Sequence, residues 1–339
     1  MLKINLITNE ELFFYENKYY CNNIEIKNLT DELDNISFTS LIGKKSKKKK
    51  FHKINNKKIF GSKNIISFLS NILDQTKIEN SVFLVVSITP FTFLSILILK
   101  LLRQKYLIYL RSDGLKEYKK IIGFLGPPIY KLLFKISIKN SKVISSSKEI
   151  LKTIEGESVI PSSLSAKWDL NKKKLNFDKI KMLYVGRLRV EKGIFSLIKI
   201  FEKINKDMQL TIIGNDDRAY KKPQLKNINF KGIISDENEL IKNYDNHNIF
   251  ILPSFTESYS MVIDEALSRL RPVIIFEEIK DIIGERKGIF VCKRDEKDLL
   301  SKINYIAMNY ENILREIKKN EFINKKQFAK TVYQKLNDL

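Results

Sequence analysis

Short apolar runs alternate with amphipathic segments along the second half of the chain, from about residue 178 onward. Most of the runs are rich in β-branched residues, and they lie at 181–186, 210–214, 227–232, 248–254 and 272–275. Apolar positions with helical spacing occupy the segments 193–204, 239–244 and 260–270. Strands that alternate with helices are typical of a parallel sheet covered by helices on both faces. The pattern predicts an α/β domain of the Rossmann-like type.

The first half of the chain shows the same alternation. Strand-like runs lie at 4–8, 81–86, 106–110 and 142–146, and helical spacing occurs near 64–76, 91–104, 127–139 and 147–154. A chain of 339 residues is long enough for two hydrophobic cores. We therefore expect two Rossmann-like domains, at 1–165 and 176–320, joined by a polar, lysine-rich linker and facing each other across a cleft. A final helix within 321–339 is expected to cross back to the N-terminal domain.

One apolar stretch, 81–102, is long enough to span a bilayer as a helix. Pro90 and the polar residues Ser87 and Thr89 interrupt it. This interruption favours a buried strand, a turn and a buried helix over a spanning segment.

The cysteines and the N-terminus indicate a reducing compartment. Cys21 and Cys292 lie far apart, and their setting shows neither a metal-ligand spacing nor a disulfide framework. The chain moves directly into a strand-like run without the features of a signal peptide. We expect a cytoplasmic protein, with a peripheral position on the inner face of the membrane as an alternative.

Basic residues dominate the charge of the chain, which has a formal net charge of +22. The run 44–58, which begins at Lys44 and ends at Lys58, holds nine lysines and no acid. Such a run is typical of a solvated or disordered loop. The alternative is a surface that binds anions, with anionic lipid ahead of nucleic acid. Nucleic-acid binding would place aromatic residues among the lysines, and Phe51 is the one aromatic in the run, so nucleic acid is not expected as a partner.

The loop after the strand at 181–186 concentrates charge between two glycines. Gly186 lets the chain leave the strand sharply, and Gly193 begins the next helical segment. Arg187 and Lys192 lie near the two ends of this loop. Arginine presents a fork of donors that fits phosphate oxygens, and lysine a compact charge. The loop is therefore either a solvated basic loop or a site for a diphosphate.

A second group of polar residues lies in the segment 253–274. Glu257 precedes a helix that we expect to begin near Ser260, and Glu265 lies about a turn and a half inside it. The start of a helix binds anions through its exposed amides and the helix dipole. Carboxylates accept hydrogen bonds from vicinal diols, and a nucleotide sugar carries diols at both ends of its diphosphate. The amides at this helix start belong to Ser258, Tyr259, Ser260 and Met261, of which Ser258 and Ser260 are candidate N-caps.

Together the two motifs resemble a known family. The segment "VGRLRVEKG" followed by "LPSFTESYSMVIDEAL" is similar to the GT-B glycosyltransferases of family 4, the group with the E-x7-E motif. The resemblance is strong over residues 178–276 and extends more weakly to "YLRSDG" and "KVISSSKEI" in the first half. It implies the GT-B fold, a nucleotide-sugar donor and transfer with retention of the anomeric configuration.

The resemblance also implies roles for individual residues. Arg187 and Lys192, next to Gly186, would contact the donor diphosphate and stabilise the leaving group. Glu257 would lie beside the hydroxyls of the donor sugar, and Glu265 would bind the ribose diol. The amides near Ser260 would contact a phosphate, and Gly232 in "NFKGII" would lie near the base.

Several positions depart from the family pattern. Many members have glycine at the positions of Ser260 and Arg271; Ser260 narrows the approach to the backbone, and Arg271 is expected at the surface. Members often carry a histidine after a strand of the first half, where this chain has "YLRSDG". His52 and His247 are not placed for that role, and His247 is expected to be exposed. Asp113 is therefore the acceptor-side candidate, as a base or as a hydrogen-bond partner, although an aspartate before a glycine is as often a plain turn residue.

These observations predict a retaining glycosyltransferase that moves a sugar from a UDP- or GDP-linked donor to a hydroxyl acceptor, in surface polysaccharide or glycolipid biosynthesis. The acceptor would be a sugar or a lipid-linked saccharide. No cofactor beyond the donor is expected, and no metal, because the chain has no Asp-x-Asp pair of the kind that holds a divalent ion in other nucleotide-sugar transferases. The alternatives are a protein that binds anionic surfaces or nucleic acid, and a nucleotide-sugar epimerase of similar two-domain shape.

Overall fold

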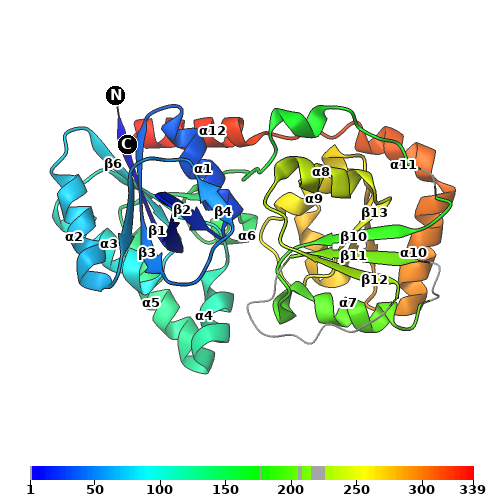
Figure 1. The fold of residues 1–339 in the computed structure, drawn as a ribbon. Helices are drawn as coiled ribbons and strands as arrows, with labels where there is room; N and C mark the ends of the chain where they lie inside the picture. The colour runs from blue at the N-terminus through cyan, green and yellow to red at the C-terminus, as the bar shows by residue number, and fades with distance from the viewer. Residues whose placement is uncertain (1, 176, 205–207, 215–225) are drawn as a thin grey trace. The chain divides into compact units, whose positions relative to one another are not determined.

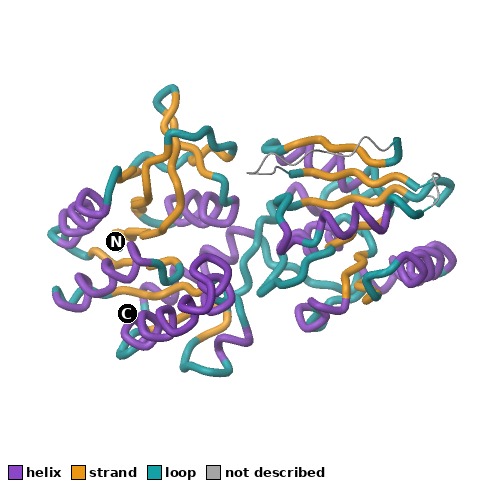
Figure 2. The backbone as a smooth tube through the Cα atoms, turned by 90° about the horizontal axis from the view of Figure 1, so that it is seen from below, coloured by secondary structure: helices purple, strands orange, loops and turns teal. Residues whose placement is uncertain are grey.

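The computed structural model describes residues 2–175, 177–204, 208–214 and 226–339. The chain divides into two compact units (Figure 1): residues 1–163 with 323–339 form the first, and residues 164–322 form the second. In each unit the strands lie between helices (Figure 2). The expected α/β fold is confirmed, with one mainly parallel sheet and one fully parallel sheet.

The first unit is built on a nine-stranded sheet. Its strands are β1 (Lys3–Tyr15), β2 (Lys18–Cys21), β3 (Phe38–Ser46), β4 (His52–Ile54), β5 (Ile59–Ser62), β6 (Ser81–Val86), β7 (Tyr106–Leu110), β8 (Lys142–Ser145) and β9 (Glu157–Ser158). Parallel pairing joins β5, β3, β1, β6, β7, β8 and β9 in that spatial order. β2 pairs antiparallel with the far end of β1, and β4 pairs antiparallel with β2.

Helices cover both faces of this sheet. They are α1 (Ile24–Asp34), α2 (Ile65–Thr76), α3 (Pro90–Leu101), α4 (Gly114–Ile122), the 3-10 helix η1 (Gly123–Leu125), α5 (Gly126–Ile138), α6 (Lys148–Leu151) and α12 (Lys325–Asn337). Successive strand residues point to opposite faces. In β6, Leu84 therefore joins the core under α1 and α12, whereas Phe83 and Val85 join the core under α2, α3 and α5.

The apolar stretch 81–102 forms a strand and a helix, as predicted. All residues of β6 are buried, and α3 begins at Pro90 after a turn. Thr89 caps α3 by accepting a hydrogen bond from the amide of Thr92, and a proline in the first turn is compatible with helix. Within the described ranges, no helix is both long enough and apolar enough to cross a membrane.

The C-terminal helix α12 returns to the first unit, as predicted. Phe328, Val332 and Leu336 are buried in the core beside α1, and the rings of Phe328 and Tyr109 lie 6.1 Å apart. Figure 1 shows this red helix beside α1. The last residues of the chain therefore complete the core of the first unit.

The lysine run 44–58 is not the solvated loop that we expected. Its first residues end β3, whose Leu41 and Ile42 are buried, and β4 lies in the middle of the run. Ile54 is only 3% exposed and anchors β4, while Lys50 pairs with Glu11 at 2.6 Å. The apolar neighbours order the backbone, so lysines project from strands, and the connecting residues 47–49 are exposed.

The second unit contains a six-stranded parallel sheet with the order β12-β11-β10-β13-β14-β15. These strands are β10 (Lys181–Val185), β11 (Gln209–Ile213), β12 (Ile228–Gly232), β13 (Ile249–Leu252), β14 (Val273–Phe276) and β15 (Ile289–Cys292). This is the Rossmann order, which reverses between β10 and β13. A ligand crevice is expected at the carboxyl ends of these two strands.

Helices and 3-10 turns connect the strands of the second unit. They are η2 (Ala166–Asp169), η3 (Val190–Lys192), α7 (Ile194–Phe201), α8 (Glu237–Asp245), α9 (Met261–Ser268), η4 (Glu277–Ile282), α10 (Glu296–Met308) and α11 (Tyr310–Ile317). Together with the strands they enclose one apolar core.

The segment expected to be a linker packs on the second unit. Trp168 is 2% exposed, and its ring meets Tyr244 edge-on at 5.3 Å. The guanidinium of Arg269 donates to the carbonyl oxygens of Trp168, Leu170 and Asn171. The same group pairs with Asp245 at 2.7 Å. The buried Arg269 thus fixes residues 168–171 on the second unit, although their polar composition predicted a solvent-exposed linker.

Two further expectations about burial are wrong. Arg271 is 1% exposed rather than at the surface; it lies 3.7 Å from Asp245 and donates to the carbonyl oxygen of Lys173. His247 is 7% exposed, with Nδ1 bonded to the carbonyl oxygen of Asn243 and Nε2 to the hydroxyl of Thr211. Burial lowers the pKa of His247 to about 4.

Candidate active site

The two sequence motifs follow neighbouring strands of the second unit. β10 pairs in parallel with β13, with Leu183 opposite Phe250. Because the strands are parallel, the loops at 186–193 and 253–260 leave the same edge of the sheet. They meet at the point where the strand order reverses, which is where such sheets bind ligands.

The backbones of these two loops are in direct contact. Gly193 adopts a φ of +66°, and a Cβ at this position would lie 1.7 Å from the carbonyl oxygen of Pro253. A glycine is therefore required here for both conformation and space. The amide of Phe255 donates to the carbonyl oxygen of Glu191 at 2.9 Å. The contact fixes the spacing between the two motifs.

A lysine and a glutamate join the loops through their side chains. Lys192 Nζ lies 2.6 Å from Glu257 Oε1, and the hydroxyl of Ser254 donates to the same oxygen at 2.7 Å. The side chains of Lys192 and Glu257 are 20% and 9% exposed. The structure thus brings together two predicted site residues that are far apart in sequence.

Arg187 differs from Lys192 in its surroundings. Its side chain is exposed, and among the described residues its guanidinium group forms neither a hydrogen bond nor an ion pair. Its backbone carbonyl accepts a hydrogen bond of 2.8 Å from the hydroxyl of the buried Tyr184. Burial raises the pKa of Tyr184 well above its ordinary value. The hydrogen bond from Tyr184 therefore fixes the backbone of Arg187, while the guanidinium group of Arg187 is exposed to solvent.

The helix expected near Ser260 begins at Met261. Ser260 occupies the N-cap position, but its side chain makes no capping hydrogen bond, so the proposed capping role is wrong. The hydroxyl of Tyr259 instead donates to Asp264 at 2.5 Å, and Arg286 pairs with Asp264 at 2.9 Å. These contacts hold the residues just before α9, and the amides at its start remain a candidate anion site.

Glu265 lies on the buried side of α9. It is 5% exposed, and the hydroxyl of Tyr244 donates to its Oε2 at 2.7 Å. Burial, followed by the nearby negative charge of Glu265, raises the pKa of Tyr244 well above its ordinary value. Tyr244 of α8 therefore orients the carboxylate of Glu265. The sequence pattern predicted that Glu265 lies in a helix but not which residue it contacts.

Arg294 holds the loop after β13 and was missed from the sequence. Its guanidinium donates to the carbonyl oxygen of Pro253 at 2.9 Å and to the hydroxyl of Ser196 at 2.7 Å. It also lies 4.0 Å from the ring centre of Phe255 and 4.3 Å from that of Phe276. The residue follows β15, a strand absent from the predicted elements, so its place at this edge could not be inferred.

Two other predicted residues lie elsewhere. Gly232 ends β12, with a φ of +73° and open space where a Cβ would stand. Asp113 belongs to the first unit, where its Oδ1 accepts hydrogen bonds from the amides of Leu115 and Lys116. Asp113 is thus the N-cap of α4, three residues after the end of β7.

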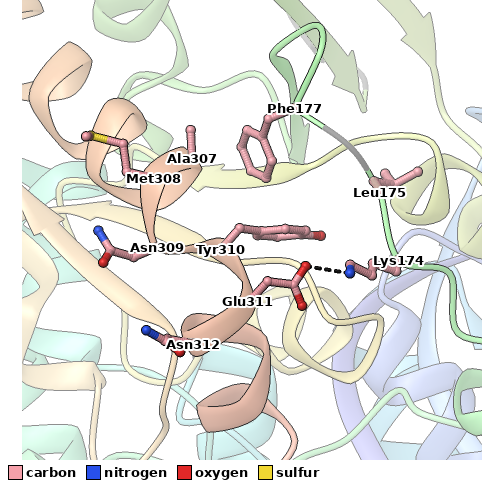
Figure 3. A pocket seen from close by; sticks show the side chains of 9 residues that line it. All are labelled: Lys174, Leu175, Phe177, Ala307, Met308, Asn309, Tyr310, Glu311 and Asn312. Carbon is pink, nitrogen blue, oxygen red and sulfur yellow. Dashed lines mark ion pairs between the residues drawn. The ribbon is translucent and has the colours of Figure 1, made fainter.

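A pocket of the second unit is lined by Lys174, Leu175 and Phe177 and by residues at the junction of α10 and α11 (Figure 3). The rings of Phe177 and Tyr310 pack edge-on at 4.6 Å in its lining, and Lys174 pairs with Glu311 at 2.5 Å. None of the predicted site residues lines this pocket. In the described part of the chain, no group of three or more His, Cys, Asp or Glu is arranged to hold a metal ion.

Comparison with known sequences relates the second unit to sugar transfer. Residues 179–309 match the family described as glycosyl transferases group 1. An uncharacterized glycosyltransferase of Haemophilus influenzae is 25% identical over 148 residues, which are 40% of this chain and 41% of that protein. The sulfoquinovosyl transferase SQD2 of Arabidopsis thaliana is 27% identical over 177 residues, which are 49% of this chain and 34% of that protein. The matches thus span less than half the length of these relatives.

Solved structures resemble the chain over its whole length. Sucrose-phosphate synthase from Thermosynechococcus elongatus has a TM-score of 0.71 at 16% identity, covering 100% of this chain and 99% of that one. HepE of Anabaena, in complex with UDP and glucose, has a TM-score of 0.68 at 11% identity, covering 100% of both chains. The chain therefore has the GT-B fold of these structures, and its residues 179–309 are similar to the group 1 glycosyl transferases.

Proposed function

We propose that the protein is a retaining glycosyltransferase of family 4 that moves a sugar from a nucleotide diphosphate sugar to a hydroxyl acceptor. The contact between Lys192 and Glu257, at 2.6 Å, carries this proposal. In this contact a cation suited to a diphosphate lies beside a carboxylate suited to sugar hydroxyls, at the edge of the sheet where the strand order reverses. That HepE was solved with UDP and glucose supports the same class of donor, linked to UDP or GDP.

The donor diphosphate would lie over the start of α9. Arg187 and Lys192 supply two positive charges, and the amides from Ser258 to Met261 add the positive end of the helix dipole. The leaving diphosphate gains negative charge as the bond to the sugar breaks, so donors fixed in advance lower the barrier. Glu265, oriented by Tyr244, would accept hydrogen bonds from the ribose diol.

The charge of these protein groups supports turnover without a divalent ion. The anomeric configuration would be retained by a front-face substitution. In this step the bond from the sugar to the diphosphate oxygen breaks while the acceptor oxygen forms its bond on the same face, and the diphosphate takes up the acceptor proton. Asp113, which follows the carboxyl end of β7, is the proposed acceptor-side residue: it would orient the acceptor hydroxyl as a hydrogen-bond partner, or, as a base, take up the proton in place of the diphosphate.

The proposed setting is surface polysaccharide or glycolipid biosynthesis, with a sugar or a lipid-linked saccharide as acceptor. A lipid-linked acceptor would bring the protein to the inner face of the membrane. The exposed lysines at 47–49 support an attraction to anionic lipid, because each basic residue near such a surface adds about 1 kcal/mol.

A transfer assay with a panel of UDP- and GDP-linked sugars tests the proposal. We expect turnover with one donor class, undiminished by excess chelator, and NMR of the product from an α-linked donor should show an α linkage. Loss of activity in chelator would overturn the metal-free diphosphate site, and a β linkage would overturn retention. Absence of transfer and of donor hydrolysis with every donor would overturn the function itself.

A further inference from the structure

Large apolar side chains are exposed on one part of the first unit. Of the large hydrophobic residues that are exposed in the described chain, half lie between residues 94 and 136, in or beside α3, α4, η1 and α5. They are Leu94, Leu97, Leu101, Leu102, Ile121, Ile122, Phe124, Leu125, Ile129, Leu132 and Ile136. Single exposed apolar residues are ordinary, but a concentration of this kind marks an interaction surface. We refer to these residues as the apolar face.

The spacing of these residues gives two helices a second apolar stripe. In α5, Ile129, Leu132 and Ile136 lie on one side of the helix, while Tyr130 and Ser137 are buried against the unit. Leu94, Leu97 and Leu101 repeat the same spacing in α3.

The ends of these two helices are tied together. Lys100 Nζ, near the end of α3, donates to the carbonyl oxygens of Ile136 and Lys139 at 2.6 Å and 2.7 Å. The two exposed stripes therefore belong to neighbouring helices.

Two of the three most exposed residues of the apolar face lie where α4 leads into α5, and the third is Leu101 at the end of α3. Ile121 and Phe124 are 78% and 84% exposed. α4 and α5 pack closely on each side of the turn between them. The rings of Tyr118 and Tyr130 lie 5.0 Å apart, and a Cβ at Gly126 would lie 2.1 Å from the carbonyl oxygen of Tyr118. Close packing of α4 on α5 thus presents these apolar side chains from a defined turn.

The surroundings of the apolar face are strongly basic. The segment 94–139 contains ten lysines and arginines against two acids, a net charge of +8. Both acids are engaged, since Asp113 caps α4 and Glu117 accepts a hydrogen bond from Ser112. Along α5 and at its C-cap, the exposed lysines Lys131, Lys135 and Lys139 recur every fourth residue beside the apolar stripe.

We propose that the apolar face and its lysines dock the protein on an anionic lipid bilayer. An apolar stripe beside basic residues is the arrangement by which helices lie in the plane of a membrane interface. The positive charge also favours an anionic bilayer over a second copy of the chain. Two copies would bring two positively charged faces together, and their repulsion opposes association. The apolar face is formed by other residues than the lysine run 44–58. Docking on lipid is independent of the proposed reaction, because it can be measured without turnover.

A tryptophan placed at the turn reports on insertion. Trp168 is the only tryptophan and is 2% exposed, so the emission added by Phe124→Trp comes from the new site. We expect its emission to shift to the blue with vesicles that mix phosphatidylglycerol and phosphatidylcholine, and to shift little with phosphatidylcholine alone. Ile66→Trp, at a 75% exposed apolar position on α2, is the matched control and should not shift. No shift of the Phe124→Trp variant, or an equal shift of both variants, would overturn the proposal.

Vesicle flotation with full-length variants gives the magnitude. Replacing Ile121 and Phe124 together with serine should weaken binding by about tenfold or more, and Ile66→Ser should leave it unchanged. Glutamine in place of Lys131 and Lys135 should cost roughly fivefold for each lysine. Binding that is lost on replacing residues 47–50 with serine but keeps its strength without Ile121 and Phe124 would overturn the proposal.

Light scattering without lipid tests the alternative that the apolar face binds a second copy of the chain. The docking proposal predicts a monomer, or an oligomer that Ile121→Ser and Phe124→Ser leave intact. A dimer that these two substitutions dissociate would assign the apolar face to self-association and overturn lipid docking.

Discussion

Removal of the Lys192 ammonium group should damage both turnover and the fold. The contact of Nζ with Glu257 Oε1 spans 2.6 Å, and the carboxylate side chain is 9% exposed. In Lys192→Ala, Glu257 keeps Ser254 as a donor but loses the opposite charge. Leaving a buried charged group short of one partner costs about 1 to 3 kcal/mol, and the 20% exposure of the lysine favours the lower part of that range.

The effect on catalysis should be larger than the effect on stability. A donor that stabilises a developing anion contributes roughly 100 to 1,000-fold in rate. We expect this loss in turnover, measured with the preferred nucleotide sugar, together with a lower free energy of unfolding in urea. Arg187→Ala is the matched control: its side chain is exposed, so turnover should fall comparably while stability changes by less than about 0.5 kcal/mol.

A double variant separates the two roles of Lys192. Adding Glu257→Gln to Lys192→Ala removes the unpaired carboxylate, so stability should recover while turnover stays low. If the double variant regained turnover, Lys192 would serve only to neutralise Glu257. If Lys192→Ala kept near-normal turnover while folded, its contact with the diphosphate would be refuted.

Three further predictions concern buried groups of the second unit. Glu265→Gln should weaken binding of UDP or GDP by about 1 to 3 kcal/mol in calorimetric titration, because the amide lacks the charge that strengthens hydrogen bonds to a diol; unchanged affinity would remove Glu265 from the site. The pKa of His247 is lowered from 6.5 to about 4 on folding, so as the pH falls through this window only the unfolded state takes up a proton, and stability should drop by about 3 kcal/mol. Urea unfolding at neutral pH and near pH 4 checks this, and a His247→Gln variant with the same pH dependence as the wild type would contradict it. Arg269→Met should lower the free energy of unfolding by about 3 kcal/mol, because the buried Asp245 loses its 2.7 Å partner and keeps only Arg271, at 3.7 Å; a loss below about 1 kcal/mol would show that the pair contributes little.

Much of the second unit could be predicted because its strands are buried on both faces. Runs such as 249–253 and 272–275 are apolar throughout, and the helix between them keeps one apolar side. The first unit was harder between residues 9 and 62. There the strands carry lysines and tyrosines on their exposed positions, and pairing with distant neighbours orders them, which local pattern does not reveal.

The candidate site was predicted as a set of residues but not as a set of contacts. Motif spacing identified Lys192 and Glu257, yet their contact depends on Gly193 packing against Pro253, which only the fold shows. The burial of Arg269 and Arg271 could not be predicted either, because it depends on contacts that only the fold shows. A charged residue after a helix usually faces solvent, whereas here the carbonyl oxygens of residues 168–173 surround the two guanidinium groups.

A crystal structure with bound UDP, and a second with GDP, would locate the proposed donor site. We expect one of the two nucleotides at the carboxyl ends of β10 and β13. Its diphosphate should lie within hydrogen-bond distance of Arg187, Lys192 and the amides at the start of α9, and its ribose should contact Glu265. A nucleotide that is bound elsewhere on the chain, or at these strand ends with its diphosphate away from Arg187 and Lys192, would contradict the proposed donor site.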